Sequence, residues 1–174
     1  MAKLTFSLDP GLVNSALVVL DYKKRKVVYQ TMVPVAITVL KNEEKDTQTK
    51  AFRKWYRKQI KKYKPIAFIA ERFQNRGFRG GQSISECVSF MLGHIDSICC
   101  VNKVQTKLVS AVVWKNKVNK CFSLEDCYSI GKELKVPPHK IDSLFMNLYL
   151  NDYNFNKLRN RKERYFWIKQ LIDK

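Results

Sequence analysis

The amino-acid sequence predicts a mixed α/β fold in which helices cover a β-sheet. Strand patterns follow one another over the first 33 residues, and helical patterns alternate with shorter strand patterns after about residue 45. No repeat, low-complexity segment or linker interrupts the 174 residues. This length suits a single domain with a genuine hydrophobic core.

The first strand is expected over residues 4–8, where apolar and polar residues alternate. Asp9 continues the polar face, and Pro10-Gly11 ends the strand. Two further strands are expected at about 16–21 and 27–33, joined by a short basic turn. Three strands in succession predict an antiparallel meander.

A helical period begins at about residue 45 and ends before Pro65. The polar face of this helix is strongly basic, and we interpret it as a solvated face in preference to a DNA contact. Residues 66–70 form a continuous apolar run, which is typical of a strand covered on both sides. Glu71 stands at the carboxyl end of that strand.

A loop rich in glycine and arginine is expected over 72–82. Ser83 and Glu86 form a capping-box pattern that predicts the start of a long helix, in which Gly93 would allow a close approach to the sheet. A short strand is expected at about 101–108, followed by a helical stretch from Ser110.

Three more helical segments are expected toward the carboxyl terminus. Ser123 is predicted to cap a short helix, and a second helix is expected from Pro138 to about Leu150. From Phe155 onward the chain is basic and aromatic, and we expect it to be helical.

The charge balance points to a polyanionic ligand. There are 33 Lys and Arg residues against 15 acids, which gives a net charge of +18. Such an excess favours phosphate contacts and counterion release. No apolar run is long enough to cross a bilayer, no basic helix has the strongly apolar face of a membrane anchor, and no signal peptide is evident, so no membrane partner is expected.

Cysteine usage predicts a reducing compartment. The chain has five cysteines, an odd number without a Cys-x-x-Cys pair, and only two histidines, which makes a structural zinc site unfavourable. Cys87 and Cys99 fit an apolar helix stripe and are expected to be buried thiols. We therefore expect a cytoplasmic protein.

Four polar residues stand where a fold seldom places them without a function: Asp9, Glu71, His139 and Asp142. The first two end strands, and the last two share one helix face. Sites of α/β folds lie at strand ends, so the four can converge on one acidic pocket. Clustered carboxylates repel one another, and hard divalent cations compensate for that repulsion. Two such ions could clamp a phosphodiester and activate water.

Each of these residues also has a purely structural interpretation. Asp9 with Pro10-Gly11 could form only a turn, and Glu71 could pair with a nearby arginine. His139 could favour a helix start, and Asp142 could complement the helix dipole. The coincidence of all four, in order on suitable elements, favours a functional site.

The sequence resembles the RuvC-type Holliday junction resolvases of the ribonuclease-H-like superfamily. LTFSLDPG at 4–11 resembles their first motif, a strand that ends in Asp-Pro-Gly. IAFIAERF at 66–73 resembles the second, and PPHKIDSLFMNLY at 137–149 resembles the third, a helix that opens with His-x-x-Asp. The resemblance covers about residues 3–150, and the short chain would suit a phage-encoded member.

The resemblance implies a ribonuclease-H-like mixed five-stranded sheet flanked by helices. Residues 1–150 would form the nuclease domain, and 151–174 a basic, aromatic helical extension of the same domain. Asp9, Glu71, His139 and Asp142 would be the catalytic residues and would hold two Mg²⁺ or Mn²⁺ ions. The implied enzyme is a homodimeric crossover junction endodeoxyribonuclease of DNA recombination and repair. It would cut two opposed strands of a four-way DNA junction.

The resemblance also implies DNA contacts. Family members carry a lysine just beyond the fifth strand, which Trp114-Lys115 matches, and Lys115 and Lys120 are candidates for backbone contacts. The glycine-rich stretch that normally follows is missing, and Ser143 stands where the family usually has alanine. Arg72-Phe73 replaces the usual Gln-aromatic pair after the glutamate.

The loop after Glu71 is a candidate for branch recognition. Arg72, Arg76 and Arg79 would contact phosphates, which position DNA without reading its sequence. Phe78 would stack on or wedge between unpaired bases. Phe73 matches the family aromatic more closely, but it could equally belong to the core.

Two other functions stay open. A ribonuclease-H-like nuclease could act on RNA–DNA hybrids or on other branched DNA, because the four residues specify phosphodiester chemistry and not substrate shape. A non-catalytic junction-binding protein could have kept only the fold, although a binder has no need for clustered carboxylates against a nucleic acid.

Overall fold

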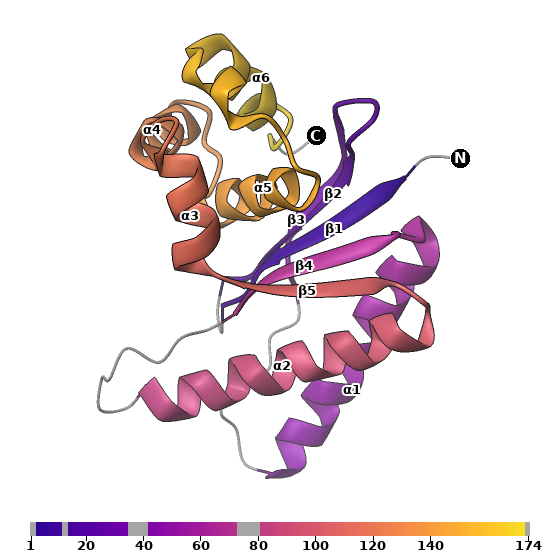
Figure 1. Ribbon diagram of the computed structural model, residues 1–174. Coiled ribbons are helices and arrows are strands. Elements are labelled where there is room, and N and C mark those ends of the chain that lie inside the picture. The colour runs from indigo at the N-terminus through magenta and orange to yellow at the C-terminus, as the bar shows by residue number, and fades with distance from the viewer. Residues whose placement is uncertain (1–2, 12–13, 35–41, 73–80, 173–174) are drawn as a thin grey trace.

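The computed structural model describes residues 3–11, 14–34, 42–72 and 81–172, and the side chains of 42–47 and 81–85 are outside the description. A five-stranded mixed sheet forms the middle layer, with helices on both of its faces (Figure 1). The predicted fold class is therefore confirmed.

The sheet has the strand order β3-β2-β1-β4-β5. Strands β1 (Leu4–Asp9), β2 (Ala16–Asp21) and β3 (Lys26–Met32) form the predicted antiparallel meander. Strand β4 (Ala67–Arg72) pairs parallel with β1, and β5 (Gln105–Ser110) pairs parallel with β4. The parallel half of the sheet brings the carboxyl ends of β1 and β4 to the same edge.

Two long helices cover one face of the sheet. These are α1 (Asn42–Tyr63) and α2 (Gly81–Val101), which lie below the sheet in Figure 1. They close a core to which the sheet contributes Phe6, Leu8 and Phe68. The apolar face predicted for the first strand is thus buried against these helices.

The other face of the sheet is covered by α3 (Ala111–Asn119), α4 (Leu124–Glu133), α5 (Pro138–Leu150) and α6 (Arg161–Lys169), preceded by the short 3₁₀ helix η1 (Phe155–Arg159). Helix α5 lies directly on β1 and β2. Helix α4 begins where Ser123 accepts a hydrogen bond from the Glu125 amide at 3.2 Å, as the capping pattern predicts.

The chain after Asn151 packs into this second core. Leu158, Trp167, Ile168 and Leu171 are fully buried, and they belong to the same apolar cluster as Leu144 of α5. Polar contacts tie α6 to the β2–β3 hairpin, because Glu163 accepts hydrogen bonds from Arg25 and from Tyr153.

Three local predictions are wrong. Helix α2 begins at Gly81, two residues before the predicted cap Ser83, because neither Gly81 nor Gln82 prevents helical backbone. The strand predicted at 101–108 runs instead from Gln105 to Ser110, since α2 continues to Val101 and Lys103 then turns the chain in a left-handed conformation. A side chain at Gly93 would meet nothing within 4 Å, so no close approach to the sheet requires this glycine.

All five cysteines are free thiols. Cys87 and Cys99 are buried, as expected, and burial raises the pKa of Cys99 to about 12. Cys100, at the end of α2, is exposed. Among the described residues, no helix combines the length and the apolar character needed to cross a membrane.

Candidate active site

Asp9 is held at the end of β1 by a tight turn. The Gly11 amide donates to Ser15 Oγ at 2.9 Å, and the Ser15 hydroxyl donates back to the Gly11 carbonyl at 2.6 Å. A β-carbon at Gly11 would lie 2.4 Å from the Asn14 carbonyl oxygen, so only glycine fits there without displacing the backbone. The turn keeps Asp9 8% exposed, next to solvent.

Glu71 lies beside Asp9 on the neighbouring strand. Leu8 pairs with Ala70 in the parallel β1–β4 ladder, so Asp9 and Glu71 follow at the same level. Side chains alternate along a strand, and both carboxylates therefore point toward the face covered by α3 and α5. Trp114 of α3, which is fully buried, donates its indole N–H to Glu71 Oε2 at 3.0 Å.

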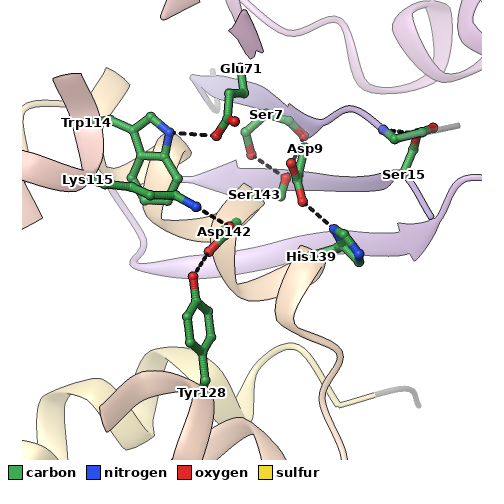
Figure 2. Close-up of polar contacts among 11 residues, drawn as sticks. Ser7, Asp9, Ser15, Glu71, Trp114, Lys115, Tyr128, His139, Asp142 and Ser143 are labelled. Carbon is green, nitrogen blue, oxygen red and sulfur yellow. Dashed lines mark hydrogen bonds and ion pairs between the residues drawn. The ribbon is translucent and has the colours of Figure 1, made fainter. Parts of the chain in front are cut away.

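The first turns of α5 bring His139 and Asp142 to the same place (Figure 2). His139 Nδ1 lies 2.6 Å from Asp9 Oδ2. Asp142 accepts a hydrogen bond from the Tyr128 hydroxyl at 2.6 Å, and Lys115 Nζ lies 3.0 Å from its other oxygen. The four residues singled out in the sequence thus come together at one edge of the sheet, from three elements.

A buried ladder of polar groups fixes α5 against β1. Ser143 donates to the Ser7 carbonyl at 2.8 Å, and Asn147 accepts from the Thr5 hydroxyl at 2.6 Å. The Asn147 amide also donates to the Thr5 carbonyl at 3.1 Å, and Asn151 donates to Thr5 Oγ1 at 2.9 Å. These hydrogen bonds lie along the face of β1 on which Asp9 also stands. They therefore fix the position of α5, and with it of His139 and Asp142, relative to Asp9.

The site is short of positive charge. Burial raises the pKa of Asp9, which the hydrogen bond from His139 only partly offsets, and the negative charge of Asp142 raises it further. Burial likewise raises the pKa of Glu71 above its usual range, against the hydrogen bond from Trp114. The hydrogen bond to Asp9 raises the pKa of His139. The shifts of Asp9 and Glu71 reflect carboxylates that are partly removed from water and close to other acids.

Lys115 is the cation nearest to these acids. Burial lowers its pKa, but the charges of Asp142, Glu71 and Asp9 together outweigh burial and raise it. As the side chains stand, no three His, Cys, Asp or Glu residues in the described part of the chain are close enough to hold a metal ion. The three carboxylates offer the oxygen donors that suit Mg²⁺ or Mn²⁺. The shortage of positive charge around Asp9 and Glu71 fits such an ion.

The predicted DNA-binding residues fall into two groups. Arg72 is exposed at the end of β4, Lys115 lies in the site and Lys120 is exposed at the end of α3. Phe73, Arg76, Phe78 and Arg79 lie outside the described residues.

A hollow of about 590 Å³ lies between α3 and α4. Lys115, Lys120 and Tyr128 line it, together with residues of the α3–α4 connection. A second, basic groove of about 760 Å³ follows the outer face of α1 and is lined by Lys50, Arg53, Lys54, Arg57, Lys58 and Lys61.

The sequence does not predict two side chains that contact the acids of this site, Trp114 and Tyr128. The sequence singles out Trp114 only as the neighbour of Lys115. Its hydrogen bond to Glu71 joins residues that are 43 positions apart, so no local pattern predicts it. Tyr128 was not singled out, because an isolated tyrosine on a short helix carries no motif. Only the packing of α4 against α5 brings its hydroxyl to Asp142.

No protein-family model matches the sequence, and a search of curated proteins finds no match. Solved structures do resemble the chain. RuvC of Thermus thermophilus in complex with Holliday junction substrate is 13% identical over 82% of this chain and 88% of its own, with a TM-score of 0.61. A second structure of Thermus thermophilus RuvC is 13% identical over 82% of this chain and 89% of its own, with a TM-score of 0.59.

The yeast mitochondrial Holliday junction resolvase Ydc2 is also similar. It is 12% identical over 98% of this chain and 79% of its own, with a TM-score of 0.54. The chain therefore has the ribonuclease-H-like fold of RuvC.

Proposed function

We propose that this chain, which shares its fold with RuvC-type resolvases, is a metal-dependent endonuclease that resolves four-way DNA junctions. The observation that carries the proposal is the convergence of Asp9 and Glu71, at equal levels on parallel strands, with His139 and Asp142 of α5. A protein with 33 basic residues places Asp9, Glu71 and Asp142 together at this one edge, with Asp9 buried.

Asp9, Glu71 and Asp142 would hold two Mg²⁺ or Mn²⁺ ions, with His139 at the side of Asp9. Two bound ions supply an activated water and stabilise the leaving oxygen of a phosphodiester. Tyr128 and Trp114 orient Asp142 and Glu71 through the hydrogen bonds that they donate. His139, with its Nδ1 at 2.6 Å from Asp9, orients that carboxylate and can accept or return a proton beside it.

DNA would bind across this edge of the sheet. Lys115, Lys120 and Arg72 surround the acids and would contact the phosphate backbone. The loop residues Phe73, Arg76, Phe78 and Arg79 would recognise the branch point, with Phe78 as the wedge. The net charge of +18 supports strong, salt-dependent attraction to DNA.

Resolution requires two cuts in opposed strands, so two active sites are needed and we propose a homodimer. Residues 1–150 would supply the nuclease domain and 151–174 an extension of it. Five free thiols support a reducing, cytoplasmic setting.

The decisive experiment offers a synthetic four-way junction to the purified protein with and without Mg²⁺. We expect paired, ligatable nicks only with the metal. Asp142→Asn should abolish cutting and retain or improve junction binding, because repulsion of phosphate falls. Wild-type cutting by Asp142→Asn would refute the assignment of this site.

The same experiment separates the alternatives. A junction that is bound but left uncut with Mg²⁺ would favour a non-catalytic binder. Faster cutting of a flap or of an RNA–DNA hybrid at matched salt would favour a different ribonuclease-H-like nuclease.

The wedge has its own test. Phe78→Ala should weaken junction cutting by about one to two powers of ten, which corresponds to the roughly 1–3 kcal/mol of one stacked base. Binding to linear duplex should barely change. A folded Phe73→Ala, Phe78→Ala double variant that cuts junctions normally would leave only the arginines to explain branch preference.

A further inference from the structure

Among the described residues, the ammonium group of Lys115 lies next to the acids of the candidate active site. Lys115 Nζ lies 3.0 Å from Asp142 Oδ2, and it reaches there over the ring of Trp114, 5.0 Å from the ring centroid. Figure 2 shows it pointing from α3 into the space between Glu71 and Asp142. The other oxygen of Asp142 accepts the Tyr128 hydroxyl. Both oxygens of this predicted metal ligand are therefore engaged by the protein.

We propose that Lys115 is a built-in counter-cation of the active site, which competes with a divalent ion for Asp142 and must leave before that ion binds. The proposal rests on the metal site proposed above and adds a residue that regulates its affinity.

The geometry distinguishes Lys115 from Tyr128, the other donor to Asp142. Tyr128 is neutral and is fixed on a helix that packs against α5. Lys115 carries a full charge on a flexible stem, and its side chain remains 33% exposed, against 13% for Asp142. An ammonium on a flexible, partly exposed stem can swing outward into water, whereas a hydroxyl on a rigid ring cannot. Lys115 is thus the donor that an incoming cation would displace.

The arrangement of the acids agrees with such a role. As they stand, no three His, Cys, Asp or Glu residues of the described chain form a group that could hold a metal ion. Partly buried carboxylates need a compensating positive charge, and Lys115 supplies it from the chain itself. Once released from Asp142, the same ammonium would be free to contact a DNA phosphate at the edge of the site.

The test measures Mn²⁺ binding by titration calorimetry on the full chain, without DNA. Lys115→Met keeps the length of the side chain but removes its charge, and it should bind Mn²⁺ roughly tenfold more tightly than wild type, as expected when a like charge a few ångströms away is removed. Lys115→Gln, which can still donate a hydrogen bond to Asp142, should show the same gain. The matched control is Lys117→Met. Lys117 is on the same helix but pairs with the exposed Asp152, so its loss changes the net charge equally and should leave affinity unchanged.

The outcomes separate this proposal from the metal site itself. If Glu71→Gln abolishes Mn²⁺ binding but both Lys115 variants bind as wild type does, the site stands and the counter-cation role is refuted. If no variant binds Mn²⁺, the metal site itself is refuted. An equal gain in Lys117→Met would show that net charge alone sets the affinity, and would also overturn the proposal.

Discussion

At the scale of single residues, the contact between His139 and Asp9 determines how a change at each residue should affect the proposed metal site. His139 Nδ1 is 2.6 Å from Asp9 Oδ2, with the imidazole 43% exposed and the carboxylate only 12%. The imidazole is thus accessible from solvent, while the carboxylate is largely buried. A change at His139 should therefore tune the site, whereas a change at Asp9 should remove it.

We expect His139→Asp to keep measurable nuclease activity, because a carboxylate supplies an equivalent oxygen ligand. His139→Ala should lower the rate further, by roughly 10–100-fold relative to wild type, as is usual when a residue that orients a ligand is removed. Initial rates of junction cutting at saturating Mg²⁺ check this. If both variants cut at the wild-type rate, His139 has no role in catalysis and only favours the start of the helix.

The raised pKa of Glu71 predicts a pH dependence of stability. Because burial raises its pKa in the folded chain, folding favours the protonated form. This contribution is complete below the pKa of the unfolded chain and is lost as the pH rises through the raised value. Glu71→Gln has no such group, so its melting temperature in a chelator should rise relative to wild type from about pH 4 to pH 8. Parallel curves for the two proteins would contradict the prediction.

The sequence predicted the acids but not the groups that hold them. Asp9 and Glu71 were recognisable because each stands at the end of a predicted strand. Trp114 and Lys115 follow β5, and Tyr128 is on α4, so their approach to the acids depends on packing between elements far apart in the chain. Periodicity and spacing describe single elements, and they contain no information on such contacts.

At the scale of elements, the decisive contact is between β1 and α5. The alternation of residues in β1 predicted one apolar face and one polar face. A polar face can be covered either by water or by polar residues of a helix, and the alternation does not distinguish the two cases. The structure shows the second case, because Ser143 and Asn147 meet Ser7 and Thr5 in the interior. The spacing of four between Ser143, Asn147 and Asn151 was the available signal. Ser143, a departure from the family pattern, is thus part of a hydrogen-bonded set.

Asn147→Ala should destabilise the protein by about 2–4 kcal/mol, because it leaves the Thr5 and Ser7 hydroxyls buried with fewer partners. Urea unfolding followed by circular dichroism measures this. Asn116→Ala, at an exposed position of α3, is the control and should stay within about 0.5 kcal/mol of wild type. Equal stability of the two variants would mean that the ladder contributes little.

At the scale of the whole molecule, the chain after residue 150 completes one of the two cores. The sequence predicted a basic, aromatic helical tail, and the alternation of large apolar residues with Lys and Arg gave no indication of which aromatics are buried. Trp167 is fully buried, while its neighbour Phe166 is 43% exposed. Periodicity in the sequence predicted the order and the type of the larger helices and strands. Which side of the tail is buried depends instead on its contacts with α4 and the β2–β3 hairpin.

Trp167→Ala should therefore cost roughly 3–5 kcal/mol of unfolding free energy, as for a large side chain removed from a core. Phe166→Ala, one residue earlier on the exposed side, should cost less than about 1 kcal/mol. Chemical denaturation of both variants is the measurement. If the tail did not contribute to the core, both variants would lose a similar, small amount of unfolding free energy.

The exposed thiol of Cys100 has a practical consequence for any measurement of assembly. A surface thiol in air can oxidise and join two molecules covalently, so that a spurious cross-linked species would migrate at the size of a dimer. Sedimentation or light scattering should therefore be performed with a Cys100→Ser variant or under a strong reductant. A two-chain particle that persists under both conditions is then held together by its surfaces alone.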